Sequence, residues 1–471
     1  MSEESKTKLV VIGAGPGGYA AAFLGADLGM EVTLIDRRKN PGGVCLYEGC
    51  IPSKALLHAA AVLNEAKHAG NFGIKFDAPK IDLDRLRSWK GEVVEKLTGG
   101  LGQLGKSRKL RYIQGSASFR DSHSLDVEVD GKTETVPFDF AIIATGSLPT
   151  KIPGLPESDR IMDSTGALDL KDIPKRLLVV GGGYIGLEMC TVYAALGSEV
   201  SVVEMAPSLL PGTDEDLVRP LAKRLGEVTK SIMLETKLAE VKADGKTLSV
   251  RFEGKQAPEG AQQFDRILLS IGRRPVTSGL GLDHTAVRVL DNGFIEVDDQ
   301  RRTSERTIFA IGDVAGQPML AHKASHEGRV AVEAIAGHKV AFEPYAIPAV
   351  VFTDPEIAYC GLTEAEAKRR NQTVKVARFP WAASGRSLSL DRTDGMTKLL
   401  IDPESERLLG VGIVGPGAGE LIAECVLAIE MGALAKDVAL SIHPHPTLSE
   451  TIMESAEVFF GTSTHIYRPK S

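Results

Sequence analysis

The feature that most constrains the fold of this chain is an internal duplication of a glycine-rich unit. The first copy begins LVVIGAGPGG and ends in LGMEVTLID, and the second begins LLVVGGGYIG and ends in LGSEVSVVE. Three glycines and a terminal acid recur at one constant offset of 168 positions. These positions are Gly13, Gly15, Gly18 and Asp36 in the first copy, and Gly181, Gly183, Gly186 and Glu204 in the second. A register held through a whole unit indicates two copies of one structural element.

Each copy has the pattern of an apolar strand, a glycine-rich turn, a helix and a second strand ending in an acid. In such a unit the first glycine makes the tight turn and the second lets the backbone approach a pyrophosphate. The third lets the helix pack closely on the strand, and the helix N-terminus binds the phosphates. The terminal carboxylate accepts hydrogen bonds from ribose hydroxyls. The sequence therefore predicts an α/β fold with two Rossmann-like dinucleotide-binding domains.

A second repeated segment locates an insertion in the first copy. FDFAIIATGSLP, from Phe138, is similar to FDRILLSIGRRP, from Phe264, at an offset of 126 positions. The change of offset from 168 to 126 means that the first copy carries 42 extra residues. The segment CLYEGCIPSK lies in that interval. We expect this insertion to bring the chemistry to one of two similar nucleotide-binding domains.

The second unit has features that favour NAD(H) over NADP(H). Its terminal acid, Glu204, would repel a 2′-phosphate, and the next three residues are Met205, Ala206 and Pro207, none of which is basic.

Composition excludes several classes of protein. The net charge of −7 argues against a general nucleic-acid binder, and no apolar run reaches membrane-spanning length. The N-terminus lacks a secretory signal, and five cysteines in 471 residues do not fit a disulfide-stapled secreted protein. We expect a cytoplasmic protein, although a mature organellar protein would look the same. No cysteine or histidine spacing is typical of a metal site, so we predict no metal.

Cys45 and Cys50 are the candidate reactive pair. In a regular helix, residues five positions apart lie about 7.5 Å apart along the axis alone, beyond the usual Cα limit of roughly 7 Å for a disulfide. A bridge therefore needs a distorted helical turn, which Gly42, Gly43 and Gly49 would permit. Cysteines near a helix N-terminus also gain a reactive thiolate. The other cysteines stand in apolar patterns and are expected to be inert: Cys190, Cys360 and Cys425.

Taken together, the motifs resemble those of the flavin disulfide reductases over nearly the whole chain. GGVCLYEGCIPSK is similar to the redox motif of that family, and ATG, AIGDV and MLAHKASHEG follow in the family's order. HPHPTLSE, from His443 to Glu450, resembles the motif of the dihydrolipoamide dehydrogenase branch. Two departures are Tyr47-Glu48, where Asn-Val is usual, and Val276, where asparagine is common. They leave the class intact and put the preferred acceptor in question.

The resemblance implies roles for particular residues. Cys45 would exchange with substrate and Cys50 would face the flavin, with Lys54 near the flavin ring and paired with Glu188. His445 would be the acid–base, oriented by Glu450 and supplied by the other subunit of a homodimer. FAD would bind the first unit and NAD the second. Further cofactor-binding positions implied in this way are Gly146, Gly272, Asp313 and Ala321.

The expected architecture is an FAD-binding domain (1–150, completed by 278–346), an NAD-binding domain (151–277) and a C-terminal α+β dimerisation domain (347–471). The implied reaction is oxidation of protein-bound dihydrolipoyl groups by NAD⁺. The implied partner is a lipoyl-bearing acyltransferase or the lipoyl carrier of glycine cleavage. Two alternatives remain: a related NADH-dependent reductase of another disulfide, and a mainly docking subunit. The sequence does not say which complex is served.

Overall fold

Each glycine-rich unit folds as a strand, a helix and a second, parallel strand in the computed structural model, which describes residues 6–467. The first unit comprises β1 (Lys8–Ile12), α1 (Pro16–Asp27) and β2 (Glu31–Asp36). The second comprises β10 (Arg176–Val180), α6 (Tyr184–Leu196) and β11 (Glu199–Val203). Both faces of β1 are buried, because Leu9 and Val11 pack in one core while Val10 and Ile12 pack in another. Because both faces of the strand are buried, the consecutive residues of β1 from Leu9 to Ile12 are all apolar, as is typical of a parallel strand.

Two parallel five-stranded sheets are built on these units, and their strand orders correspond position by position. The first sheet contains, in order, β18 (Ile308–Ala310), β7 (Phe140–Ile143), β1, β2 and β3 (Arg111–Gln114). The second contains β9 (Ile161–Met162), β16 (Arg266–Leu269), β10, β11 and β12 (Ser231–Met233). The duplication seen in the sequence is therefore a duplication of whole sheets, and the α/β fold class is confirmed.

The two halves also share an inserted antiparallel sheet at the same point of the chain. In the first half this sheet is formed by β4 (Ser116–Asp121), β5 (Ser124–Val129) and β6 (Lys132–Pro137). In the second half it is formed by β13 (Thr236–Asp244), β14 (Thr247–Gly254) and β15 (Gln262–Phe264). A short ribbon of β8 (Ser147–Pro149) and β17 (Arg273–Pro275) connects the halves. The first sheet is completed only by β18, after the chain has passed through the second half.

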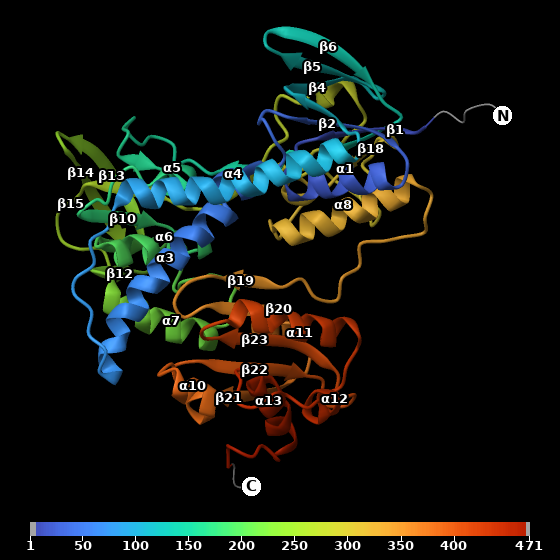
Figure 1. Cartoon of the computed structure of the whole chain (residues 1–471). Helices are drawn as coiled ribbons and strands as arrows, with labels where there is room; N and C mark the ends of the chain where they lie inside the picture. Colours follow the sequence, from blue (N-terminus) through green and yellow to red (C-terminus); the bar gives the residue numbers. More distant parts are fainter. Residues whose placement is uncertain (1–5, 468–471) are drawn as a thin grey trace.

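The cysteine segment lies on the first two of three helices between β2 and β3: α2 (Gly43–Glu48), α3 (Cys50–His68) and α4 (Leu83–Ser107). At the corresponding point, between β11 and β12, the second half has the single helix α7 (Glu215–Val228). Leu56 and Leu57 of α3 pack in the same core as Leu187 of α6, so this insertion is held against the second half. Figure 1 shows α4 extending toward α1 across the upper part of the molecule, below β4, β5 and β6. Within residues 6–467, none of the helices combines the length and the apolar character needed to cross a membrane.

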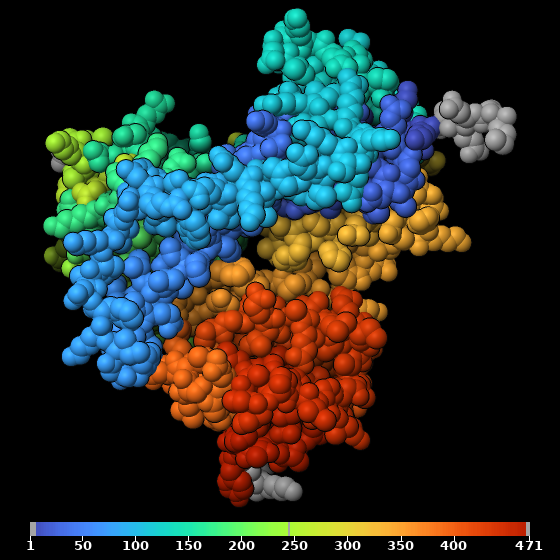
Figure 2. All heavy atoms as spheres, viewed as in Figure 1, coloured from blue at the N-terminus to red at the C-terminus, as the bar shows by residue number. Residues whose placement is uncertain are grey.

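The C-terminal part contains an antiparallel sheet and several helices. Its sheet runs in the order β19 (Ala349–Val351), β20 (Ile357–Gly361), β23 (Leu408–Val414), β22 (Met396–Ile401) and β21 (Lys375–Pro380). The principal helices are α11 (Ala418–Glu430) and α13 (Glu450–Phe460), and their buried residues share one core with the sheet. Figure 2 shows this part, coloured orange to red, as a lobe of its own beneath the others. We propose the expected boundaries as the domain boundaries of the chain.

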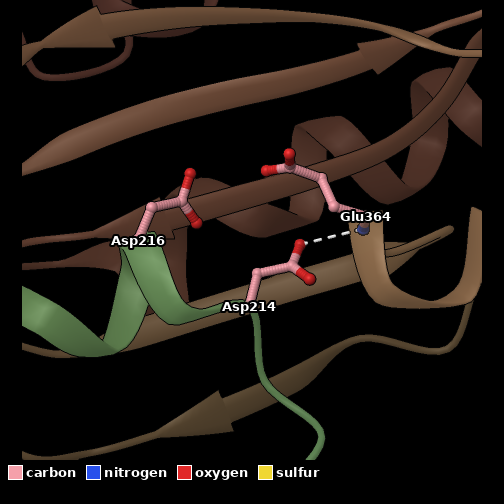
Figure 3. Close-up of side chains that lie close together, drawn as sticks. All are labelled: Asp214, Asp216 and Glu364. Carbon is pink, nitrogen blue, oxygen red and sulfur yellow. Dashed lines mark hydrogen bonds between the residues drawn. The ribbon is translucent and has the colours of Figure 1, made fainter. Parts of the chain in front are cut away.

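A cluster of charges joins the C-terminal lobe to the second half. Asp214 and Asp216 stand at the start of α7 (Glu215–Val228), and Glu364 begins α9 (Glu364–Arg369). Figure 3 shows the three carboxylates converging, with the Glu364 N–H donating to Asp214 at 3.1 Å. The Lys398 ammonium, on a side chain only 1% exposed, donates to all three at 2.6–2.7 Å. This ammonium occupies the position that a metal ion would need, so the cluster is an interdomain ion-pair network.

Replacing Lys398 by methionine should destabilise the docking of the C-terminal lobe, because three carboxylates would lose their ammonium partner. Breaking a buried ion pair on one side costs about 3–5 kcal/mol. We expect the midpoint of thermal unfolding to fall by at least about 5 °C. The matched control is Lys368→Met, at an exposed lysine of the same lobe. An unchanged midpoint for Lys398→Met would show that the cluster does not hold the lobes together.

Candidate active site

The helix that would carry both reactive cysteines is interrupted between them. α2 ends at Glu48, and α3 begins at Cys50. Gly49 joins the two with φ −146° and ψ −116°, and a Cβ there would lie 2.9 Å from the Val44 carbonyl oxygen. Only glycine lets the two helices meet this closely. The distortion expected from the five-residue spacing is confirmed, and Cys50 stands at the N-terminus of a long helix.

The two thiols are hydrogen-bonded to each other and differ in acidity. The hydrogen bond from Cys45 lowers the pKa of Cys50 to about 7; Lys54 lowers it further, while burial and Glu188 oppose the shift. The same hydrogen bond, together with burial, raises the pKa of Cys45. These directions favour Cys45 as the proton donor and Cys50 as the thiolate of the pair. The helix N-terminus favours this negative charge as well.

An ion pair lies beside the thiols and connects the inserted helix with the second half. Lys54, one turn after Cys50 on α3, donates to both oxygens of Glu188 on α6, at 3.0 and 2.9 Å. The Glu188 side chain is 4% exposed and that of Lys54 is 33% exposed. The pairing implied by the family resemblance is thus present. A buried carboxylate needs such a partner, because an unpaired charge is costly to bury.

A long, partly open cavity extends from the first glycine-rich turn to the cysteines, and about 1190 Å³ in and at its mouth is not filled by protein atoms. The expected site residues that line it are Gly13, Gly15, Gly18, Asp36, Cys45, Cys50, Lys54, Gly146, Glu188, Asp313 and Ala321. Its walls are mainly apolar, with a glycine-rich helix N-terminus at one end and an ammonium beside a thiol at the other. This arrangement fits an elongated dinucleotide whose reactive ring reaches Cys50 and Lys54, as FAD requires.

The terminal acid of each unit anchors its own glycine-rich turn. Asp36 accepts the N–H groups of Ala14 at 2.8 Å and Arg38 at 2.9 Å. Glu204 accepts those of Gly182 at 2.6 Å and Ala206 at 2.7 Å. In each unit the acid therefore fixes the backbone of its own glycine-rich turn.

Steric contacts explain the glycines of both units. Gly13 has φ +99°, and a Cβ at Gly18 would lie 1.8 Å from the Gly13 carbonyl oxygen. The corresponding Gly181 has φ +105°, and a Cβ at Gly186 would lie 2.4 Å from the Gly181 carbonyl oxygen. A Cβ at Gly183 would meet no protein atom within 4 Å, so open space lies over the second turn. Together with Glu204, this open turn fits a second dinucleotide such as NAD. Gly272, with φ +113°, also borders open space.

A buried network holds the turn that carries Asp313. Glu327, 0% exposed, accepts the Gly312 N–H at 2.7 Å and pairs with Lys323 at 3.1 Å and Arg301 at 3.0 Å. Asp313 itself accepts a hydrogen bond from Ser147 Oγ at 2.6 Å. Lys323 and Glu327 lie in the MLAHKASHEG motif, but their spacing in the sequence does not indicate what they do. Their function is to fix the backbone at one wall of the cavity.

His445 and Glu450 form a pair away from this cavity. His445 Nδ1 lies 2.9 Å from Glu450 Oε1, and the Thr447 N–H donates to Glu450 Oε2 at 2.8 Å. Burial opposes the shift, but the Thr447 N–H and the His445 ring lower the pKa of Glu450. The His445 side chain is 74% exposed, and neither residue lines the cysteine cavity. Within one chain the structure therefore separates this pair from the thiols.

The residues that depart from the family pattern each interact with neighbouring residues. Glu48 pairs with Arg38 at 2.9 Å, and Tyr47 Oη donates to the Asn40 carbonyl at 3.2 Å. The charge added between the cysteines is thus balanced by an arginine of the same cavity wall. Val276 is held through its backbone, by bonds to Gly146 and Thr145, which do not require a particular side chain.

Sequence reasoning did not single out several residues that shape the site. Tyr184 and Arg273 line the cavity from the second half, and Arg273 donates to Ser147 Oγ at 2.7 Å. Arg273 lies in the repeated IGRRP segment, which was a usable signal, whereas Tyr184 is simply the first residue of α6. Phe352 contacts Lys54 and Glu188 from the C-terminal lobe, a contact that nothing local in the sequence indicates.

Comparison with known proteins places the chain in a family. Residues 7–328 match the family described as pyridine nucleotide-disulphide oxidoreductase, and residues 347–456 match the dimerisation domain of that family. The chain is 51% identical to a dihydrolipoyl dehydrogenase of Haemophilus influenzae, covering 100% of this chain and 98% of the relative. It is 46% identical to a dihydrolipoyl dehydrogenase of Geobacillus stearothermophilus, covering 98% of each.

Solved structures agree with this placement. The crystal structure of LpdA from Mycobacterium tuberculosis superposes with a TM-score of 0.89 at 27% identity, covering 96% of this chain and 99% of that one. The flavoprotein disulfide reductase RclA from Escherichia coli, solved as a Cu(II) complex, gives a TM-score of 0.86 at 27% identity, covering 96% and 99%. The chain therefore belongs to the pyridine nucleotide-disulphide oxidoreductases and, among them, to the dihydrolipoyl dehydrogenases.

Proposed function

We propose that the protein oxidises protein-bound dihydrolipoyl groups and reduces NAD⁺, with Cys45 and Cys50 as the redox pair. The observation that carries this proposal is the thiol pair at the interrupted helix, beside the Lys54–Glu188 ion pair and in a cavity that extends to the first glycine-rich turn. Full-length similarity to dihydrolipoyl dehydrogenases supports the choice of substrate.

Particular residues would hold the two cofactors. FAD would lie in the long cavity, with its pyrophosphate at the N-terminus of α1, its ribose at Asp36 and its ribityl chain at Asp313. NAD⁺ would bind the turn over Gly183, with its ribose at Glu204. The flavin supplies the link between a two-electron thiol couple and a hydride acceptor, which side chains alone do not provide.

The exchange step follows from the thiol acidities. A thiolate of the dihydrolipoyl group attacks Cys45 of the Cys45–Cys50 disulfide, and Cys50 leaves as the thiolate, which its low pKa favours. The second substrate thiol then displaces Cys45 and closes the lipoyl disulfide. Two electrons pass to the cysteine pair. A nearby base takes the protons of the attacking thiols in turn, gives one of them to the Cys45 sulfur as that sulfur leaves, because the pKa of Cys45 is raised, and keeps the other, so that Cys50 remains the thiolate. Lys54 stabilises the Cys50 thiolate formed in this step.

We assign that base to His445. Glu450 accepts from Nδ1, which fixes the tautomer with Nε2 free to take the proton of the attacking thiol. Because His445 is remote from the thiols of its own chain, the proposal requires a homodimer in which the histidine faces the partner subunit's cavity. A match to a dimerisation domain over residues 347–456 supports this arrangement. The partner would be a lipoyl-bearing acyltransferase or a glycine-cleavage lipoyl carrier, in the cytoplasm.

The direct test is reduction of NAD⁺ by dihydrolipoamide, followed by the absorbance of NADH, with reduced glutathione as the monothiol control. We expect turnover with dihydrolipoamide, and a loss of at least about a thousandfold in Cys45→Ser, since serine cannot form the disulfide. Cys190→Ser, at a buried cysteine outside the cavity, should retain activity. Turnover by Cys45→Ser would exclude the disulfide mechanism, and an inactive wild-type enzyme would point to another disulfide substrate.

The rate at which Cys50 is alkylated should rise with pH as its thiol loses a proton. The positive charge of Lys54 should help to set the pH at which this happens. In the reduced protein the thiolate forms as the pH rises through about 7, so alkylation of Cys50 by iodoacetamide should be half-maximal near that pH. Lys54→Met removes the stabilising ammonium and should move the midpoint to higher pH. Lys67→Met, at an exposed lysine of the same helix, is the control. Mass spectrometry of the Cys50 peptide measures the rates, and equal midpoints for Lys54→Met and wild type would contradict this role.

Nucleotide preference should follow the charge of Glu204. Glu204→Gln keeps the size of the side chain but removes the charge that repels a 2′-phosphate. The ratio of kcat/KM for NAD⁺ over NADP⁺ should fall by at least about tenfold, corresponding to about 1.4 kcal/mol. Asp36→Asn, the equivalent change in the first unit, should leave this ratio unaltered. A shift of the ratio in Asp36→Asn alone would reverse the assignment of the two nucleotide sites.

A further inference from the structure

Phe352 of the C-terminal lobe contacts both members of the Lys54–Glu188 ion pair. It directly follows β19, and its ring packs against the core of the second half. Its N–H donates to Glu188 Oε1 at 3.2 Å. The centre of its ring lies 4.4 Å from the Lys54 ammonium nitrogen. One residue thus reaches a carboxylate of the second half and an ammonium of the inserted helix.

These two contacts restrict the geometry of the ion pair. The Lys54 ammonium has the Glu188 carboxylate at 2.9 and 3.0 Å and, in addition, an aromatic face. A cation over an aromatic ring is attracted by the negative face of the ring, so the ring favours one position of the ammonium. The N–H of Phe352 holds one oxygen of Glu188, so the carboxylate cannot rotate freely toward or away from the lysine.

The position of this pair matters for the cysteines because its two charges act on Cys50 in opposite directions. Lys54 favours the Cys50 thiolate and Glu188 disfavours it. Their combined effect depends on which charge lies closer to the sulfur. A residue that fixes both charges therefore fixes how strongly the reduced, thiolate form of the pair is stabilised.

We propose that Phe352 is a positioning residue for the thiol–disulfide reaction, which holds Lys54 and Glu188 in place relative to Cys50 and so tunes the reduction of the Cys45–Cys50 disulfide. Docking of the C-terminal lobe thereby sets the charge environment of the cysteines. The lobe that carries His445 and Glu450 also carries this residue. The inference rests on the proposed function only in taking Cys45 and Cys50 as the redox pair.

The test measures the equilibrium between this disulfide and dithiothreitol in the holoenzyme. Dithiothreitol is oxidised to its cyclic disulfide while two electrons reduce the cysteine pair to two thiols. At pH 7 part of Cys50 is a thiolate, and the corresponding proton goes to the buffer. Acid quenching, alkylation and mass spectrometry give the reduced fraction at each ratio of reduced to oxidised dithiothreitol.

In Phe352→Leu, which keeps an apolar side chain but loses the aromatic face, the equilibrium constant for reduction at pH 7 should fall by at least about threefold. Phe352→Tyr keeps the ring and should behave as wild type. The matched control is Tyr359→Leu, which removes an aromatic ring that packs against the same core without touching the ion pair. If Phe352→Leu does not fold, Phe352→Met carries the same expectation.

A purely structural role predicts a different result. In that case Phe352→Leu and Tyr359→Leu would both lower the midpoint of thermal unfolding, and both would leave the equilibrium constant as in wild type. That outcome would overturn the inference. The measurement uses neither NAD⁺ nor dihydrolipoamide, so a failure of the proposed substrate assignment would appear in the turnover assay and not here.

Discussion

Glu188 lies on the buried face of α6 in the second half of the molecule, where a carboxylate without a partner would be strongly disfavoured. Its cation comes from Lys54, on a helix inserted into the first half. The two halves must therefore meet at this ion pair, which lies one helical turn from Cys50. The position of the inserted helix, the wall of the long cavity and the acidity of the thiol pair all depend on this contact.

The duplication explains why the halves can meet in this way. Both sheets have the same strand order, and each carries an acid that accepts two backbone N–H groups around its glycine-rich turn. The first sheet is completed by β18, which follows the whole second half in sequence. The chain thus closes its first domain only after forming the second, and the cavity includes residues of both.

Much of this arrangement was predictable from the sequence. The fixed offset between Gly13 and Gly181 predicted two similar nucleotide-binding domains, and the spacing of Cys45 and Cys50 predicted that a bridge between them needs a distorted helical turn. These predictions succeed because turns and helix breaks depend on local backbone requirements. The 42-residue insertion likewise pointed to the segment that carries the cysteines.

Other features required the tertiary structure. Phe352 reaches Lys54 across nearly 300 positions of sequence, and no periodicity or motif predicts such a contact. Glu364 lies 150 positions from Asp214 and is nevertheless beside Asp214 and Asp216 in the structure. Nothing in the local sequence shows that their common partner, Lys398 on β22, is buried. The distance of His445 from the cysteines of its own chain is also a property of domain packing. The expectation that His445 serves the other subunit came from the family resemblance and not from the spacing of residues.

The most direct test of the central claim is a single turnover without pyridine nucleotide. The oxidised enzyme is mixed anaerobically with one equivalent of dihydrolipoamide per chain, quenched with acid and alkylated. The masses of its cysteine-containing peptides are then measured by mass spectrometry. We expect Cys45 and Cys50 to pass from a disulfide to two alkylated thiols, while Cys190, Cys360 and Cys425 are unchanged between treated and untreated enzyme. Oxidation of dihydrolipoamide with the state of Cys45 and Cys50 unchanged would contradict it.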